Sequence, residues 1–480
     1  MIEIQNFING EWRDANSGKK MEVVDPSRGS VYGQLSFSDS SDVKDAIHAA
    51  KNAYPEWSKM SISKRSQLMM KLADLIDENA DSLIKAESLD NGKPLKLAKH
   101  VDIPRASANI RFYAQAIGQF HGDSYMMDDG SVNYTSYESL GVVTCISPWN
   151  LPLYLFTWKI APALATGNTI VAKPSEVTPY TAYLFSKLFK EAGFPKGVLN
   201  IINGIGSEVG EELVKNENIK AVSFTGSTRT GEIISESVAG AFKKVSLEMG
   251  GKNPNVIFED CDYDKMLSTT VHSSFSNQGQ ICLCGSRILV EKSLAPKFLK
   301  DFVEKAKELK VGPPSESDTK VGAIVSKEHY SKILKYIGIA KEEGGEILCG
   351  GNAIHPEGDY KNGYYIEPTI IVNLNQQCRT NQEEVFGPVV SVDTFETIDE
   401  AIEKANSTKY GLSATVWTKD TSKALRASRE IQAGIVWVNC WLKRDLRTPF
   451  GGVKNSGVGR EGGMDALKFF TEVKNTCISQ

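Results

Sequence analysis

The chain has 480 residues, of which 41% are hydrophobic and 24% are charged, and its formal net charge is -4. A chain of this length can bury large cores and is expected to form two or three domains. The small negative charge gives no electrostatic basis for binding nucleic acid or an anionic membrane, and the longest apolar runs have only strand length, so we expect no membrane-spanning segment.

Cysteine and histidine usage narrows the class of protein further. The eight cysteines are scattered and do not resemble a disulfide framework, and the six histidines form no zinc-binding spacing, so we expect no metal. The N-terminal residues MIEIQNFINGEW contain neither a basic leader nor a signal-type apolar run. We therefore expect a cytoplasmic protein with free thiols.

The N-terminal part of the chain predicts short strands followed by helices. Turns at Asn9-Gly10 and Ser17-Gly18 punctuate the strands expected between residues 6 and 37. Apolar residues then recur at helical spacing, and Arg105 lies near the start of the third of these helices, which are expected over residues 42–57, 63–92 and 100–117.

From residue 122 onward the pattern changes twice. Residues 122–141 alternate polar and β-forming residues, which predicts a hairpin. Apolar strands then alternate with amphipathic helices, which favours a parallel, doubly wound sheet that binds ligands at the carboxyl ends of its strands. These strands are expected at residues 142–147, 168–174, 198–206, 221–227 and 244–249.

After Glu248 a second α/β unit begins, with no linker or repeat inside it. Its strands are expected at residues 287–292, 364–372, 389–395, 413–418 and 434–439, and its helices at residues 295–309, 330–343, 398–407 and 421–431. We expect the active site in the cleft between the two units.

Three polar residues are candidates for chemistry. Cys282 lies at the centre of FSNQGQICLCGSR, which is typical of a reactive thiol on a loop, although an inert buried cysteine is the alternative. Glu248 ends an apolar strand just before two glycines, where it would be either a general base with a raised pKa or a solvated strand end. Asn150 follows another strand in a proline-flanked turn, where its amide could donate to an oxyanion or cap the backbone.

Dinucleotide binding is indicated by two segments. The G-x-G-x-x-G fingerprint is absent, and GIGSEVG at 204–210 is only a looser relative. Gly226 and Ser227 lie where a strand gives way to a helix, so free N–H groups there could receive a pyrophosphate, while an ordinary helix cap is the alternative. Lys173 in KPSE could hold the adenosine ribose hydroxyls, or be a solvated loop charge.

Taken together, the segments ISPWNLP, KPSE, FTGS, KVSLEMGGKNP, EEVFGP and TPFGG, with Cys282 between them, resemble the aldehyde dehydrogenase superfamily from end to end of the chain. This resemblance implies a Rossmann-type NAD-binding domain over residues 1–120 and 142–247 and a second α/β catalytic domain over residues 248–455. It also implies a small β oligomerisation ribbon and tail over residues 121–141 and 463–480, which would build a homodimer or homotetramer.

The same resemblance assigns cofactor residues. It places Glu176 beside the adenosine ribose, where a carboxylate would repel a 2'-phosphate, so NAD is favoured over NADP. It places Glu384 and Phe386 at the nicotinamide side. The full expected set is Ser147, Trp149, Lys173, Ser175, Glu176, Gly206, Phe224, Gly226, Ser227, Leu247, Glu384 and Phe386.

The mechanism implied by the resemblance is covalent. Cys282 attacks an aldehyde, and the oxyanion is held by the Asn150 amide and the Cys282 backbone N–H. The thiohemiacetal loses a hydride to NAD, and Glu248 activates water to hydrolyse the thioester. Glu248 favours hydrolysis over transfer to coenzyme A, and Lys159 matches a family lysine that would assist proton movement or is otherwise a helix-face charge.

The substrate is suggested by a closer resemblance. DIPRASANIRF, SSFSNQGQICLC and the closing GIVWVNCWLKRDLRTPFGG are similar to the 2-hydroxymuconate and 2-aminomuconate semialdehyde dehydrogenases, in which two arginines bind the remote carboxylate. Arg105 and Arg444 match these arginines, and Arg447 is a nearby competitor. Apolar walls are expected from Leu155, Trp158, Trp441 and Phe450, and Cys284 would line the pocket or pack.

Two other functions remain open at this stage. A betaine- or aliphatic-aldehyde dehydrogenase would need an aromatic cage or a bare apolar funnel. A catalytically silent scaffold protein would have no chemical need for Cys282, Glu248 and Asn150 together. The sequence also leaves open whether the substrate carries an amino or a hydroxy group.

Overall fold

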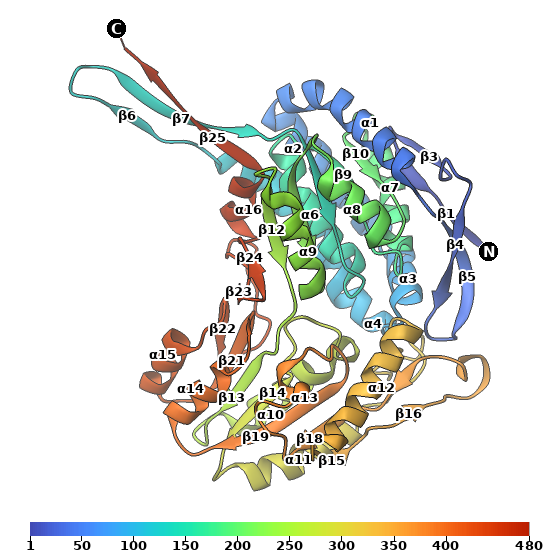
Figure 1. Ribbon diagram of the computed structural model, residues 1–480, viewed down its shortest axis with the longest axis vertical. Helices are drawn as coiled ribbons and strands as arrows, with labels where there is room; N and C mark the ends of the chain where they lie inside the picture. The colour runs from blue at the N-terminus through green and yellow to red at the C-terminus, as the bar shows by residue number, and fades with distance from the viewer. Residues whose placement is uncertain (480) are drawn as a thin grey trace.

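The computed structural model describes residues 1–479 as two α/β bodies stacked end to end, with a β-ribbon projecting from one of them (Figure 1). The first body contains an eight-stranded sheet of order β24-β12-β11-β8-β9-β10-β2-β3. Its five central strands are parallel, as the strand and helix alternation predicts, and they are β8 (Val142–Ile146), β9 (Thr169–Lys173), β10 (Leu199–Ile201), β11 (Ile219–Thr225) and β12 (Lys244–Glu248).

The N-terminal strands extend and flank this sheet. The hairpin of β2 (Asn6–Ile8) and β3 (Glu11–Arg13) turns at Asn9 and Gly10, whose φ angles of 53° and 78° confirm the predicted turn. A separate three-stranded sheet is formed by β1 (Ile2–Ile4), β4 (Lys20–Asp25) and β5 (Ser30–Ser36).

Helices cover both faces of the first sheet. One face packs mainly on α2 (Ile62–Glu78), α3 (Ala80–Asn91), α5 (Ile103–Ala116), α6 (Pro152–Ala165) and α7 (Tyr180–Ala192). The other face packs on α1 (Ser40–Lys59), α8 (Glu211–Lys215) and α9 (Thr228–Ala239). This arrangement buries both sides of the strands, which is why they read as nearly continuous apolar runs.

The helical region predicted over residues 63–92 is present, and the chain divides it into two helices, α2 and α3. The break lies at Asn79, whose side-chain Nδ2 donates to the carbonyl of Leu75 at 2.9 Å and so competes with helix continuation. The end at Gly92 is confirmed, since this glycine closes α3 with a φ of 80°.

The second body contains a seven-stranded sheet of order β15-β18-β19-β14-β13-β21-β22, parallel except for β15. The strands are β13 (Pro254–Ile257), β14 (Arg287–Glu291), β15 (Glu346–Cys349), β18 (Thr369–Val372), β19 (Val389–Phe395), β21 (Ser413–Trp417) and β22 (Ile435–Val438). The main helices are α10 (Tyr263–Phe275), α11 (Ala295–Lys307), α12 (Lys327–Glu342), α14 (Ile398–Asn406) and α15 (Thr421–Glu430).

Two details of this body differ from expectation. The strand predicted over residues 364–372 is split into β17 (Tyr365–Ile366) and β18, because Pro368 lacks the N–H that a continuous ladder requires. The strands β13 and β15 were not predicted, and β13 is short and begins with Pro254 and Asn255, two poor strand formers.

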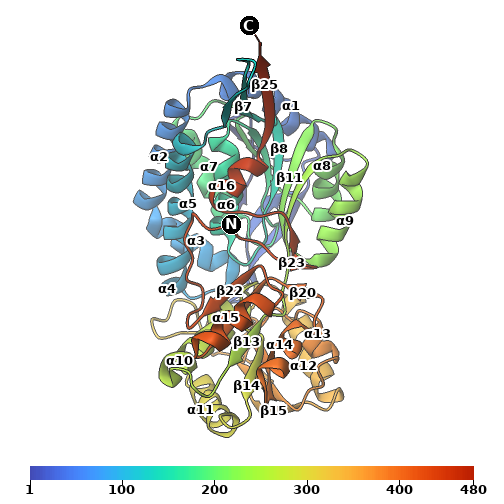
Figure 2. The ribbon, with the colours of Figure 1, turned by 90° about the vertical axis from the view of Figure 1, so that its left-hand side faces the viewer.

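The predicted hairpin is present and forms a three-stranded antiparallel ribbon with the C-terminal residues. It consists of β6 (Ser124–Met126), β7 (Val132–Ser139) and β25 (Thr471–Ile478), and it projects away from the first body in both views (Figures 1 and 2). Strand β24 (Gly457–Val458) and helix α16 (Gly463–Phe469) join the first body just before the ribbon. The exact domain bounds given above stay a prediction. Within residues 1–479, every helix is too short or too polar to cross a membrane.

Candidate active site

The loop that carries Cys282 has an unusual backbone. Helix α10 ends at Phe275, and the short turn η4 (Ser276–Gly279) then places Asn277, Gln278 and Gly279 in succession at φ angles of 50°, 59° and 69°. Residues other than glycine rarely adopt this left-handed region, so the turn is strained. A Cβ at Gly279 would lie 2.1 Å from the carbonyl oxygen of Gly387, so this position also requires glycine for space.

Side-chain amides hold the strained turn in place. Gln278 donates to the carbonyl of Ala323 at 3.0 Å and accepts from the N–H of Gly322. Gln280 accepts from the N–H of Val325 at 3.2 Å. Because these amides are buried and bonded to a neighbouring segment, they fix the direction in which the chain reaches Cys282.

Cys282 lies deep in the cleft, with its side chain partly exposed to a cavity. Its carbonyl accepts from Asn253 Nδ2 at 2.7 Å, and its backbone N–H donates to no other group in residues 1–479. Burial raises the pKa of the Cys282 thiol above its usual range, and the carboxyl groups of Glu248 and Glu384 act in the same direction. The structure therefore presents a protonated thiol beside a free amide hydrogen.

Asn150 meets this loop from the first body. It lies between β8 and α6, is 3% exposed, and donates through Nδ2 to the carbonyl of Gln280 at 3.0 Å. Since an amide nitrogen carries two hydrogens, one remains for another acceptor. Asn150 and Cys282 line the same cavity of about 230 Å³, so the two predicted oxyanion donors are brought together.

Glu248 ends β12 and faces the cavity that contains Cys282. It is 3% exposed, and its Oε1 has no hydrogen-bond partner in the described part of the chain. Burial, followed by the nearby carboxylate of Glu461, raises its pKa well above the usual value. Lys159 is buried and pairs with Glu461, with 2.6 Å between Nζ and Oε1, so it reaches this region through Glu461.

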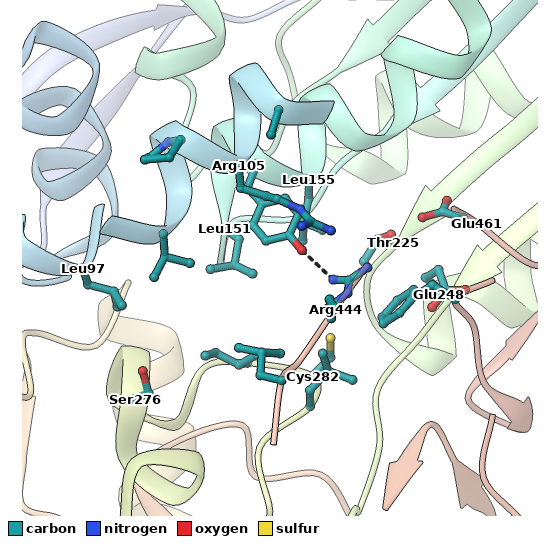
Figure 3. Close-up of a pocket in the computed structure, with 18 of the residues that line it drawn as sticks. Leu97, Arg105, Leu151, Leu155, Thr225, Glu248, Ser276, Cys282, Arg444 and Glu461 are labelled. Atoms are coloured by element: carbon teal, nitrogen blue, oxygen red, sulfur yellow. Dashed lines mark hydrogen bonds between the residues drawn. The ribbon is translucent and has the colours of Figure 1, made fainter. Parts of the chain in front are cut away.

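A larger cavity of about 430 Å³ extends from Cys282 and Glu248 to Arg105, Leu155, Arg444 and Phe450 (Figure 3). Arg444 donates to the Tyr154 hydroxyl at 2.5 Å, and its guanidinium carbon lies 4.0 Å from the Phe450 ring centroid. The Arg105 guanidinium carbon lies 5.5 Å from the Tyr154 ring centroid. Within residues 1–479, neither arginine has a carboxylate within 4.0 Å. Two cationic groups thus converge without a counter-ion.

Three expected pocket residues lie elsewhere. Trp158 packs behind the cavity, with its ring 5.7 Å from the Arg105 guanidinium and 5.1 Å from that of Arg444. Trp441 is buried and donates to the carbonyl of Leu283 at 2.9 Å. Arg447 is mostly exposed and pairs with Asp445 at 2.6 Å, so it does not compete with Arg444. Cys284 is buried in the core beside these residues.

Most of the expected cofactor residues line a second cavity of about 430 Å³ at the carboxyl ends of the first sheet. They are Ser147, Trp149, Lys173, Ser175, Glu176, Gly206, Phe224, Gly226 and Ser227. Glu384 and Phe386 line the cavity of about 230 Å³ that also contains Cys282, Trp149 and Gly226. Leu247 lines neither cavity, because its side chain is 1% exposed and packs within the sheet core.

The geometry of this second cavity fits a dinucleotide. Ser227 begins α9 and accepts from the N–H of Thr230 at 3.2 Å, so the helix N-terminus opens toward the cavity. A Cβ at Gly226 would lie 2.5 Å from the Phe224 ring, so a larger residue would clash with this ring. Glycine at this position leaves the backbone open to the cavity. Lys173 Nζ lies 3.0 Å from Glu176 Oε2, so a donor and an acceptor for ribose hydroxyls stand side by side in this cavity.

Sequence reasoning missed several lining residues. Tyr154, Thr225 and Glu461 face the larger cavity, and His329 faces the smaller one, where it contacts the Phe386 carbonyl at 2.7 Å. Tyr154 lies in the first turn of α6, just after the motif that contains Asn150, and this proximity could have identified it. Glu461 lies on an irregular segment with no motif, so only the fold reveals it.

This site defines an enzyme with a buried thiol nucleophile between a dinucleotide cleft and a substrate cavity. The aldehyde dehydrogenase family matches residues 12–476, and the chain belongs to that family. The predicted family, fold class and enzyme class are thereby confirmed.

Individual relatives cover the whole chain. It is 48% identical over 480 residues to the 2-aminomuconic semialdehyde dehydrogenase of Danio rerio, with 99% of this chain and 98% of the relative covered. It is 41% identical over 484 residues to the 2-hydroxymuconic semialdehyde dehydrogenase of Pseudomonas sp. (strain CF600), with 100% of both covered. The crystal structure of PnpE in complex with nicotinamide adenine dinucleotide matches with a TM-score of 0.97 and 39% identity over 99% of this chain and 98% of that chain.

The raised pKa of Cys282 predicts a pH dependence of alkylation. Since the thiolate is the nucleophile, iodoacetamide should label Cys282 of the cofactor-free enzyme slowly at pH 7 and progressively faster as the pH rises above 9. Peptide mass spectrometry measures the rate, with the exposed Cys477 as an internal reference for an accessible thiol. Rapid, pH-independent labelling of Cys282 between pH 6 and 8 would contradict the prediction.

Proposed function

We propose that the enzyme oxidises 2-hydroxymuconate or 2-aminomuconate 6-semialdehyde to the dicarboxylic acid, with NAD as hydride acceptor. The observation that carries this proposal is the pair of guanidinium groups, Arg105 and Arg444, at the far end of the cavity that contains Cys282. A substrate that bears an aldehyde at one end and a carboxylate at the other would occupy both ends of this cavity.

The carboxylate end is supported by the charge balance of the cavity. Two partly buried guanidinium groups without a carboxylate partner repel each other, and Arg444 lowers the pKa of Arg105 in addition to the effect of burial. A bound carboxylate would relieve this repulsion and could accept hydrogen bonds from both arginines. Tyr154 accepts from Arg444, so its own hydroxyl hydrogen stays available to the same carboxylate.

The aromatic groups argue against a betaine-aldehyde dehydrogenase. Phe450, Trp158 and Tyr154 surround a cation already, because the Arg444 guanidinium lies 4.0, 5.1 and 5.9 Å from their ring centroids. A quaternary ammonium would therefore meet an occupied cage and a like charge. A simple aliphatic aldehyde would leave both guanidinium groups unpaired. A silent scaffold would not require Cys282 to share one cavity with Asn150 and the adjoining cavity with Glu248.

The reaction begins at Cys282. Its sulfur, once deprotonated, attacks the aldehyde carbon, and the new oxyanion is held by the second Asn150 amide hydrogen and the free Cys282 N–H. Bound NAD supplies the acceptor for the hydride that leaves the thiohemiacetal. Glu248, when ionised, then removes a proton from the water that hydrolyses the thioester on Cys282.

The residues that would hold NAD come from both bodies. Ser227 and the start of α9 would face the pyrophosphate, Lys173 and Glu176 the adenosine ribose, and Glu384 and Phe386 the nicotinamide ribose. Glu176 and Glu211 both line the adenosine end, and two carboxylates there would repel the 2'-phosphate of NADP. This supports a preference for NAD.

We also propose that copies of the chain assemble through the ribbon into a homodimer or homotetramer in the cytoplasm. The ribbon exposes large apolar side chains, which an isolated copy would leave in water. They are Tyr125, Met126, Met127, Tyr134, Val473 and Ile478. The eight free cysteines suit a reducing compartment.

The substrate assignment is tested by initial rates of NADH production. The panel contains 2-hydroxymuconate semialdehyde, its amino counterpart, betaine aldehyde and hexanal. Replacing Arg105 or Arg444 by Ala should raise the KM for the muconic substrates about 30-fold or more, a loss of ~2 kcal/mol for a charged hydrogen bond, and raise that for hexanal less than about threefold. Tyr154→Phe should act in the same direction and more weakly.

Tyr113→Phe provides the matched control, because Tyr113 is buried next to Trp158 but does not line the cavity. Equal changes of KM for muconic substrates and hexanal, or a higher kcat/KM for betaine aldehyde than for the muconic substrates, would contradict the assignment.

The role of Glu248 is tested by Glu248→Gln. Removing the base should leave a rapid burst of about one NADH per active site and lower the steady-state rate by about 100-fold, since only hydrolysis of the thioester is blocked. Because the pKa of Glu248 is raised well above that of an ordinary carboxyl group, the wild-type steady-state rate should rise with pH as this carboxyl ionises, and the variant should lose this rise. A variant with normal turnover would exclude Glu248 as the base.

Assembly through the ribbon is tested by light scattering coupled to size exclusion. Changing Val473 and Ile478 to Lys removes apolar surface from β25 and should shift the enzyme to a smaller species at micromolar concentration. The same change at Leu425, an exposed apolar residue on α15, serves as the control. An unchanged mass for the ribbon variant would place the assembly surface elsewhere.

A further inference from the structure

A buried ionic triad lies directly behind the active site and takes no part in the chemistry described above. Lys93 is fully buried, and its Nζ lies 3.0 Å from Asp102 Oδ1 and 3.7 Å from Glu87 Oε1. Both carboxyl groups are also 0% exposed. The same Nζ donates to the backbone carbonyl of Asn150 at 3.1 Å. One ammonium therefore joins three separate segments of the first body.

The triad is not explained by stability alone. Removing three ionisable groups from water carries a large penalty, and well-packed apolar side chains often serve a core equally well. The unbonded oxygens Oε1 of Glu87 and Oδ2 of Asp102 show that the hydrogen bonding is incomplete. The net stabilisation from this cluster is therefore a poor explanation for its presence. The positions in which it holds the three segments are a better one.

The protonation of the triad keeps its charge low. Burial raises the pKa of Glu87 to about 8 and raises that of Asp102, while the ammonium of Lys93 opposes both shifts. The raised pKa of Glu87 favours its protonated form, and Lys93 and Asp102, with 3.0 Å between Nζ and Oδ1, form the closer ion pair. This pair is close to neutral, so it exerts little field on the cavity, and its effect is one of position.

Each partner of Lys93 belongs to, or is bonded to, a segment that carries a residue expected to bind the substrate. The Asn150 carbonyl accepts from Lys93 and from Asn277 Nδ2 at 3.0 Å, so Lys93 supports the residue expected to hold the oxyanion. Asp102 ends the π-helical turn η1 (Ala98–Asp102), which continues directly into α5, and Arg105 follows one turn later. Glu87 accepts from the N–H of Leu153 at the start of α6, next to Tyr154.

We propose that Lys93 is a positioning residue that sets the spacing between Asn150 and Arg105, and thereby the length of the carboxylated aldehyde that the enzyme accepts. This inference rests on the proposed function, in which Asn150 binds the aldehyde end and Arg105 the carboxylate end. The π-helical turn supports it, because such turns insert an extra residue and here shift the start of α5 relative to the preceding segment.

The central experiment uses the full-length enzyme with NAD and the variant Lys93→Met, which keeps the length of the side chain without its donor. The KM for the muconic substrate should rise about tenfold, the KM for hexanal should change less than about twofold, and kcat should fall for both because Asn150 is no longer held. A purely structural role would reduce the amount of active enzyme, measured by the NADH burst, and leave both KM values unchanged. That result would overturn the inference.

A double-variant cycle with Arg105→Ala tests whether Lys93 acts through Arg105. If it does, the double variant should show the same KM for the muconic substrate as Arg105→Ala alone. If the increases in KM from the two single variants multiply in the double variant, the two residues act independently, and this result would overturn the inference. If Arg105→Ala itself leaves this KM unchanged, the proposed function and the inference both fail, whereas a response to Arg105→Ala without one to Lys93→Met rejects only the inference.

Asp102→Asn decides the question if Lys93→Met does not fold. This change has the same shape and leaves the bond from Lys93 to Asn150 intact, so it should raise the KM for the muconic substrate and leave kcat for hexanal unchanged. An unchanged KM would overturn the inference. Lys404→Met is the control for loss of a lysine that pairs with carboxylates far from the cavity, and it should leave both KM values unchanged.

Discussion

The site depends on a strained turn that the rest of the structure holds in place. Three successive left-handed residues precede Cys282, and such a turn persists only where surrounding contacts determine it. Here the contacts are buried side-chain amides, because Asn277 bonds to the Asn150 carbonyl and Gln280 both accepts from Val325 and receives Asn150 on its own carbonyl. The nucleophile and the oxyanion donor are thus parts of one hydrogen-bonded unit, although they are more than a hundred residues apart.

The two ends of the substrate cavity beside this unit carry different ionisable groups. Near the sulfur, the carboxyl groups of Glu248 and Glu461 are buried close to each other, which favours the protonated form of Glu248. At the far end, Arg105 and Arg444 are held over aromatic rings without a counter-ion. An anionic group is therefore attracted to the arginine end, which favours one orientation for a substrate with a single carboxylate.

Much of the architecture could be predicted because it follows from local patterns. The parallel strands of the first sheet, the end of α3 at Gly92 and the turn at Asn9 each follow from a short pattern in the sequence. The break at Asn79 could not be predicted, since its cause is one side-chain bond within a strongly helical stretch. For the site, motifs located Cys282, Glu248 and Asn150, whereas Glu461 and Tyr154 depend on how distant segments meet. The Leu247 side chain packs in the sheet core because alternate residues of a strand face opposite ways, and its neighbour Glu248 takes the cavity side.

The segment from Leu442 to Glu461 connects the two bodies and completes the cavity. It leaves the second sheet after β22, contributes Arg444 and Phe450, and reaches the first sheet at β24, just before Glu461 (Figure 1). The carboxylate end of the cavity therefore combines Arg105 from one body with Arg444 from a segment that spans both. Because Cys282 belongs to the second body and Asn150 to the first, any change in their relative position alters the oxyanion contact and the distance between the two arginines together. Selection of substrate length and stabilisation of the reacting oxygen are thus consequences of the same packing between the bodies.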